Sequence, residues 1–178
     1  MAACLSAASS VSVQAAPVAI GAFSGSATLI NFDDLAGAPG LGAGTVITNQ
    51  YAAQGVTFTD AAVTANSHLG SLIPASSAPN VAWVFQGGGG SFAPLSLNFS
   101  GSVRRVGFDF GSSLDSFLTI AAYDSSNALI ESLNFVGGAI PVGLGGFAGI
   151  EESVDIARIA VSYHPNSSPG RTFNFSID

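Results

Sequence analysis

Apolar and polar residues alternate along most of the chain after residue 27. In LSLNFSG, residues 95–101, every second side chain is apolar, and in VRRVGFDFG, residues 103–111, Val106, Phe108 and Phe110 share one side. Successive side chains of a β-strand point to opposite faces, so this period of two predicts strands with one buried face. The other segments with this pattern are 27–34, 55–60, 81–87, 116–124, 128–135, 156–164 and 172–178.

These nine segments are short, and turn-forming residues rather than helices separate them. Gly, Pro, Asn and Ser lie between them, and DSSN at 124–127 predicts a hairpin between two strands. The best helical candidate, NQYAAQG at 49–55, is only a turn or two long. Short strands at this spacing predict an all-β protein, an antiparallel two-sheet β-sandwich, with a single domain at 27–178.

Charge is scarce in this sequence. Of the 178 residues 8% are charged, against about 25% in an average protein; lysine is missing, and the formal net charge is −7. Binding to a phosphate backbone requires clustered Lys and Arg, so we expect no nucleic-acid partner. Neutral strand edges resist pairing with other sheets poorly, so self-association is one role that this composition favours.

The first 26 residues do not continue the alternating pattern. Residues 1–16, MAACLSAASSVSVQAA, are small and weakly polar, which predicts a signal peptide cleaved near Ala15 or Ala16 and an N-terminal segment at 17–26. A basic n-region is missing, so the alternative is an ordinary N-terminal segment. Cys4 is the only cysteine, so a processed chain would carry no disulfide. No run reaches the ~18 apolar residues of a transmembrane helix.

Two adjacent aspartates, Asp33 and Asp34, precede the glycine-rich loop at 36–44, and Asp178 ends the last predicted strand. Calcium takes six to eight oxygen ligands from carboxylates and backbone carbonyls, often from loops at strand ends. The first and last strands of a sandwich commonly lie close together, so the three carboxylates form a candidate calcium site. The alternative is that the aspartates form a turn and accept backbone hydrogen bonds.

Aromatic residues at strand positions give a candidate ligand-binding site. Trp83, Tyr163 and His164 can stack on sugar rings or contact a protein, and the latter two lie at the end of a predicted strand. Trp83 lies between Val81 and Phe85 at strand spacing, so a place in the core is its alternative.

Catalytic patterns are weak. A glycan-cleaving enzyme needs two positioned carboxyl groups, for which Asp109 and Glu131 are candidates, with His164 as a further acid–base group. Glu151 and Glu152 are adjacent in a strand-like segment, so they should point to opposite faces and not act as a pair. The sequence has no G-x-S-x-G nucleophile motif.

Several segments, in order, resemble a group of exported bacterial β-sandwich domains. They are INFDDL, GTVITNQYAAQGVTF, RRVGFDFGS, AYDSSNALIESL, GGFAGIEES, IARIAVS and FNFSID, which together extend over nearly the whole span from Leu29 to Asp178. Domains of this kind occur in PEP-CTERM-type surface proteins of Gram-negative bacteria. The sorting tail of that group, a VPEP-like motif with an apolar helix and arginines, is not present in this sequence.

The resemblance implies a fold, a location and a role. The fold would be a jelly roll similar to carbohydrate-binding modules, secreted or held at the cell surface of a Gram-negative bacterium. Calcium bound by Asp33 or Asp34 with Asp178 would join the first strand to the last. The partner would be an extracellular polysaccharide or a cell-surface component, and the module would be non-catalytic. The alternatives are a self-associating matrix protein and a glycan-cleaving enzyme.

Overall fold

β-Strands make up most of the part of the chain that the structure describes. The computed structural model describes residues 16–23, 25, 27–36, 44–59, 61–65, 80–84, 94–112, 116–136, 146–165 and 175–177. Its strands are β1 (Ala16–Pro17), β2 (Val46–Ile47), β3 (Val56–Thr59), β4 (Ala61–Ala65), β5 (Asn80–Val84), β6 (Leu95–Phe99), β7 (Arg105–Ser112), β8 (Ser116–Tyr123), β9 (Leu129–Val136), β10 (Gly146–Glu151), β11 (Arg158–Pro165) and β12 (Phe175–Ile177).

Helical structure in the described residues is limited to two short 3-10 turns. They are η1 (Ile20–Ala22) and η2 (Ala52–Gln54), and the second lies inside the predicted helical segment. No helix among the described residues is long and apolar enough to cross a membrane.

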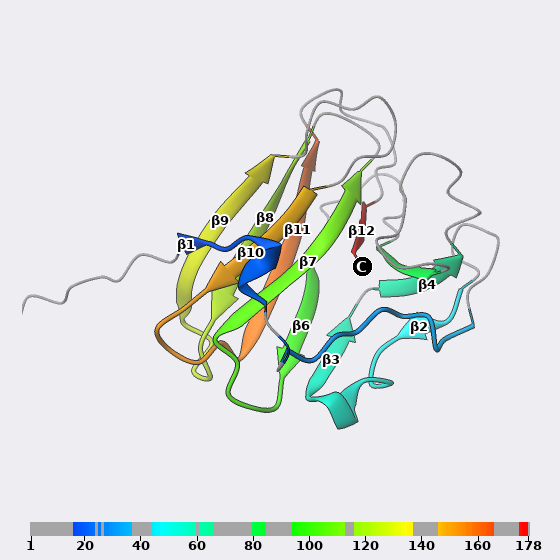
Figure 1. Ribbon diagram of the computed structural model, residues 1–178, viewed down its shortest axis with the longest axis horizontal. Helices are drawn as coiled ribbons and strands as arrows, with labels where there is room; N and C mark the ends of the chain where they lie inside the picture. The colour runs from blue at the N-terminus through cyan, green and yellow to red at the C-terminus, as the bar shows by residue number, and fades with distance from the viewer. Residues whose placement is uncertain are drawn as a thin grey trace, which may run out of the picture.

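The strands form two antiparallel sheets in a jelly-roll order. One sheet has the order β1-β10-β7-β12-β5-β4-β2 and the other β3-β6-β11-β8-β9. The pairs β8·β9, β7·β10, β6·β11 and β5·β12 are nested around one another, as in a long hairpin rolled into two layers. Eight strands connected in this way define a jelly roll, so the predicted two-sheet sandwich is confirmed (Figure 1).

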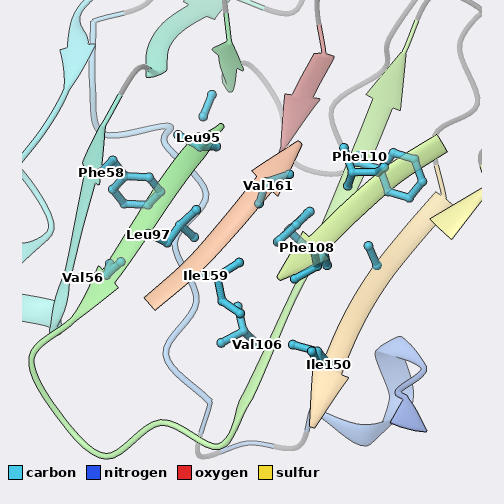
Figure 2. Close-up of a cluster of buried hydrophobic side chains, with 14 of the residues drawn as sticks. Val56, Phe58, Leu95, Leu97, Val106, Phe108, Phe110, Ile150, Ile159 and Val161 are labelled. Carbon is cyan, nitrogen blue, oxygen red and sulfur yellow. The ribbon is translucent and has the colours of Figure 1, made fainter. Parts of the chain in front are cut away.

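The core lies between the two sheets and contains the predicted apolar faces. Figure 2 shows side chains from both sheets meeting there, with Phe108 of β7 and Ile159 of β11 among them. Ile159, Ile150 and Leu95 are fully buried. The alternation read from the sequence therefore identified the buried face of β3, β6 and β7 correctly.

The strand predicted at 27–34 is wrong. Residues 28–31 are extended without a sheet partner, and 32–35 form a turn in which Phe32 has a φ of +59°. Conversely, β1, β2, β4 and β10 were not among the nine predicted strands. The pattern of β10, GFAGIE, is interrupted by glycines, which hides its alternation of apolar and polar residues.

Residues 16–17 pair with β10 as the edge strand β1, and the chain then crosses the outer face of the seven-stranded sheet as far as Phe23. Val18 N–H donates to the Gly149 carbonyl at 3.1 Å, and the Phe23 ring meets Phe147 edge to face. Gly149 pairs with Gly107 on β7, and a Cβ at either position would collide with these side chains. The glycine pair therefore provides the space in which this N-terminal segment packs.

Arg105 holds the same segment through its guanidinium group. It donates to the Ala22 carbonyl and to Glu151 Oε1, the latter at 2.5 Å, and it lies over the Phe23 ring. The segment that begins at Ala16 is therefore a packed part of the sandwich.

Candidate functional site

The two adjacent aspartates lie in a tight turn that carries its own hydrogen bonds. Leu35 N–H donates to the Phe32 carbonyl at 3.2 Å and closes the turn. Asp33 Oδ1 accepts a hydrogen bond from the Asn80 backbone N–H at 3.0 Å, and Asp34 is exposed. The turn is therefore joined to the first residue of β5, 47 positions along the chain.

The side chain of Asn80 is buried and makes further hydrogen bonds to the same turn. Its side chain is 3% exposed, and Nδ2 donates to the Leu35 carbonyl at 2.8 Å and to the Phe32 carbonyl at 3.2 Å. These two bonds use both amide hydrogens of the side chain. One buried amide thus fixes the conformation of the turn.

Asp34 is joined to the core through Tyr51. The Tyr51 hydroxyl donates to Asp34 Oδ1 at 2.6 Å, and its ring packs edge to face against Phe32 and Phe58. Burial raises the pKa of Tyr51 well above its usual value, and the hydrogen bond to Asp34 and the negative charges of Asp34 and Asp33 add to this. Tyr51 is therefore a neutral donor at every physiological pH.

These contacts bear on the predicted calcium site without testing it. Asp33 accepts a backbone N–H, as in the turn alternative, whereas Asp34 accepts from the Tyr51 side chain, and Asp178 lies outside the described residues. No group of three or more His, Cys, Asp or Glu side chains gathers within the described residues. Calcium binding by Asp33, Asp34 and Asp178 stays a prediction.

For the three predicted ligand-binding residues the structure describes only the backbone. Trp83 lies in β5, paired with Ala62 and Ser176. In β11, Tyr163 pairs with Leu118 and His164 with Phe117. Their side chains lie outside the described part, so their role as ligand contacts stays a prediction.

The outer face of the five-stranded sheet is mostly polar and carries little charge. The strand register aligns its outward positions into rows that cross the sheet, because directly paired residues point to the same side. The first row is Thr57, Asn98, Arg158, Tyr123 and Leu129; the second is Thr59, Ser96, Ala160, Ala121 and Ser132; and the third is Ser162, Thr119 and Asn134.

Arg158 is the only charged residue in these rows. Its guanidinium carbon lies 3.7 Å from the centroid of the Tyr123 ring, and Nη2 donates to Asn127 Oδ1 at 2.7 Å. In the third row, Thr119 Oγ1 donates to Asn134 Oδ1 at 2.7 Å. The face thus presents fixed hydroxyl and amide groups beside the planar guanidinium group of Arg158. The sequence did not predict this surface, because residues that are far apart in the chain become neighbours only through the order of the strands in the sheet.

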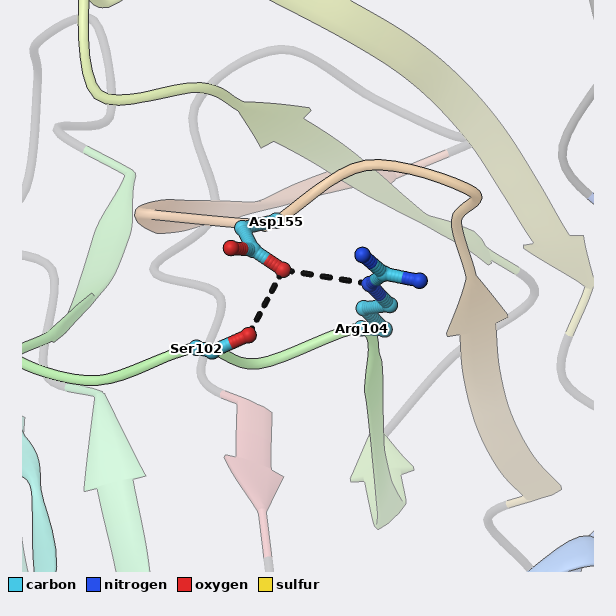
Figure 3. Close-up of polar contacts among 3 residues, drawn as sticks. All are labelled: Ser102, Arg104 and Asp155. Atoms are coloured by element: carbon cyan, nitrogen blue, oxygen red, sulfur yellow. Dashed lines mark hydrogen bonds and ion pairs between the residues drawn. The ribbon is translucent and has the colours of Figure 1, made fainter.

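At one end of the sandwich, hydrogen bonds join the loop before β7 to the loop after β10 and close the turn between β8 and β9. Asp155 Oδ1 accepts from Ser102 Oγ at 2.7 Å and from Arg104 Nε at 3.1 Å (Figure 3), and these bonds lower the pKa of Asp155. Asp124 Oδ1 accepts three bonds in the predicted 124–127 hairpin turn, which is confirmed between β8 and β9. This end of the fold is therefore well ordered by polar contacts.

Glu152 is a buried acid at the same end. It follows β10, its N–H donates to the Arg104 carbonyl at 2.8 Å, and its side chain is 5% exposed. Oε1 has no hydrogen-bond partner in the part of the chain that the structure describes. Burial, and then the charge of Glu131, raise the pKa of Glu152 above its usual value.

We predict that this acid makes the protein less stable as the pH rises. Because the folded pKa exceeds the unfolded value of about 4.3, the folded state binds more protons between the two values, and the free energy of unfolding falls through that window. Glu152→Gln should remove this slope and raise stability at pH 8 by about 1 kcal/mol or more. Urea unfolding in EDTA at pH 5 and pH 8 measures the difference; equal slopes in both proteins would contradict it.

The carboxyl groups considered for glycan cleavage do not meet. Asp109 lies between the buried Phe108 and Phe110, so it points to the outer face of the seven-stranded sheet. Glu131 pairs with the fully buried Ala122 and faces the interior of the sandwich. Glu151 points outward to Arg105 while Glu152 is buried, which confirms that these neighbours take opposite faces.

The chain has no match among the proteins with which it was compared. No family model, no curated protein and no solved structure matches it.

Proposed function

We propose that the protein is an exported, non-catalytic module that binds an extracellular polysaccharide or a cell-surface component. The observation that carries this proposal is the polar outer face of the five-stranded sheet, in whose rows Arg158 is the one charged residue. Sugar hydroxyls both donate and accept hydrogen bonds, and Ser, Thr and Asn side chains do the same without the desolvation cost of a charge. Five strands span about 19 Å, which suits an extended chain of several sugar units.

The arrangement of the face supports binding at low entropic cost. Thr119 and Asn134 already hold each other in place, and Arg158 is fixed by Asn127 and the Tyr123 ring. Side chains that are ordered before the ligand arrives lose less freedom on binding. The jelly-roll order is also one that lectin domains use, which supports the proposal by analogy of fold alone.

The proposal includes secretion from a Gram-negative bacterium, as in PEP-CTERM-type surface proteins, and a structural calcium ion. The ion would lie at Asp33, Asp34 and Asp178. The remaining carboxylate oxygens of the turn and nearby carbonyls suit a hard cation. Tyr163 and His164, at the end of β11 in the same sheet, would add contacts to this ligand, whereas Trp83 lies in the seven-stranded sheet and would contact a ligand only on the other side of the sandwich.

Self-association is the second candidate, and exposed apolar side chains favour it. Leu129 on the edge strand β9 is 57% exposed, and Val46 on the edge strand β2 is 60% exposed. Edge strands with few charges are the usual route to sheet-to-sheet pairing. A glycan-cleaving enzyme has less support, because Asp109 and Glu131 lie on different sides of the fold.

Electrophoresis in native gels that contain one polysaccharide each tests the proposal. We expect a neutral polysaccharide to retard the wild-type protein, and the double variant Asn98→Ala, Thr119→Ala to bind about tenfold more weakly. Each lost hydrogen bond costs about 0.5–1.5 kcal/mol, and 1.4 kcal/mol is tenfold in affinity.

Ser153→Ala is the matched control, because Ser153 is exposed in the loop after β10 and does not belong to the three rows. Equal retardation of the double variant would remove the face from the binding site. Oligomers that grow with protein concentration in the absence of sugar, without any retardation, would favour self-association instead.

A further inference from the structure

Arg158 lies at the centre of the polar outer face. It begins β11, the middle strand of the five-stranded sheet, and in its row it stands between Asn98 of β6 and Tyr123 of β8. It is also the one charged residue of the three rows. A ligand that crosses the sheet along this row would therefore pass over a single guanidinium group.

Neutral groups hold this guanidinium in one orientation. Its carbon lies 3.7 Å from the centroid of the Tyr123 ring, and Nε and Nη2 both donate to Asn127 Oδ1, at 3.2 and 2.7 Å. Asn127 has a left-handed backbone conformation, with a φ of +62°, in the turn between β8 and β9. A stacked and hydrogen-bonded guanidinium loses little freedom when a ligand binds to it.

No carboxylate among the described residues pairs with Arg158. The other two described arginines each have one, since Arg104 pairs with Asp155 and Arg105 with Glu151. The sequence has 11 acidic residues and 4 basic ones, so acidic partners are in excess. The residue that holds Arg158 is nevertheless an amide, which leaves the positive charge without a neighbouring counter-charge in the described part of the fold.

Part of the guanidinium edge is left for a ligand. Arginine has five N–H donors, and Asn127 accepts one from Nε and one from Nη2. The hydrogens of Nη1 and the second hydrogen of Nη2 have no acceptor among the described residues. Asp124, the acid of the same turn, accepts its hydrogen bonds from Ser126 and Ala128 instead. The open edge is one with which arginine binds a carboxylate through two parallel hydrogen bonds.

We propose that the polysaccharide carries carboxylate groups and that Arg158 binds one of them, which rests on the proposed function of the same face. Neutral sugar hydroxyls would contact the Ser, Thr and Asn side chains of the rows while the carboxylate occupies the open guanidinium edge. The net charge of −7 disfavours a densely anionic polymer, because like charges repel. The ligand is therefore a largely neutral chain in which a uronate sugar recurs at intervals.

Isothermal titration at physiological ionic strength tests this assignment with a pair of oligosaccharides. The first carries one glucuronate among neutral hexoses, and the second is the same molecule after reduction of its carboxyl group to an alcohol. We expect the wild-type protein to bind the acidic form about five- to tenfold more tightly, as for one bidentate ion pair at a partly exposed site.

Arg158→Gln should lose this preference and keep the weaker binding of the reduced form. Arg158→Lys keeps the charge but not the planar pair of donors, so it should lose most of the preference. Arg104→Gln is the matched control and should retain it, because Arg104 is an exposed arginine outside the three rows.

The outcomes separate this inference from the proposed function. Equal affinity of the wild-type protein for the two forms, or an unchanged preference in Arg158→Gln, would overturn the role of Arg158 and leave polysaccharide binding in place. Failure of the wild-type protein to bind either form would count against both.

Discussion

Replacing Asn80 by aspartate is expected to destabilise the folded protein by about 3–5 kcal/mol. The side-chain amide donates both of its hydrogens to the carbonyls of Phe32 and Leu35 from a position that is 3% exposed. An aspartate of the same shape would place a charged oxygen against these carbonyl oxygens and beside Asp33. Buried charges without a partner carry penalties of this size.

Urea unfolding at pH 7 measures this loss. Asn49→Asp is the control, because Asn49 is exposed in a loop before η2, and it should change stability by about 0.5 kcal/mol or less. Asn80→Asp should also regain part of its stability toward pH 4, where the new carboxyl group becomes protonated. A loss below 1 kcal/mol would mean that the turn is not fixed by Asn80.

Replacing Tyr51 by alanine is also expected to lower the free energy of unfolding by about 3–5 kcal/mol. Its ring is 3% exposed and packs against Phe32 and Phe58, with ring centroids 5.6 and 6.1 Å apart. Truncation removes this packing and leaves a cavity beneath the turn. It also removes the 2.6 Å hydrogen bond to Asp34.

Tyr51→Phe separates the two contributions, because it keeps the ring and deletes only the hydroxyl. The expected cost is about 1.5–3 kcal/mol, as for hydrogen bonds to charged groups. Denaturant unfolding of both variants gives the comparison. Equal losses in Tyr51→Phe and Tyr51→Ala would show that the hydrogen bond, and not the packed ring, stabilises this region.

The strand segments with strict alternation could be predicted, because the alternation that identifies the buried face is contained within each short segment. Segments 95–101 and 103–111 lie in β6 and β7 with the expected residues inward. The turn at 32–35 could not be predicted, since Asn80, 48 positions from Phe32, imposes its conformation. β10 was hidden because Gly149 serves packing against Val18 rather than the pattern of its own strand.

The candidate sites were less accessible from the sequence than the fold. Asp33 and Asp34 stood out in the sequence because charge is scarce. In the structure each carboxylate accepts a hydrogen bond, Asp33 from the Asn80 N–H and Asp34 from the Tyr51 hydroxyl. From the sequence, Glu152 was considered only together with Glu151, as neighbouring acids that point to opposite faces and do not act as a pair. Its inward position follows the period of Ala148 and Ile150, and Glu131 meets it only because the roll brings β9 and β10 together.

The central claim is that the outer face of the five-stranded sheet holds the ligand. Nuclear magnetic resonance titration of the isotopically labelled protein with the polysaccharide that retards it tests this most directly. We expect shift changes at the backbone amides of Asn98, Thr119, Asn134 and their row neighbours, with the turn at 32–35 unaffected. Shifts confined to the seven-stranded sheet or to that turn would contradict it.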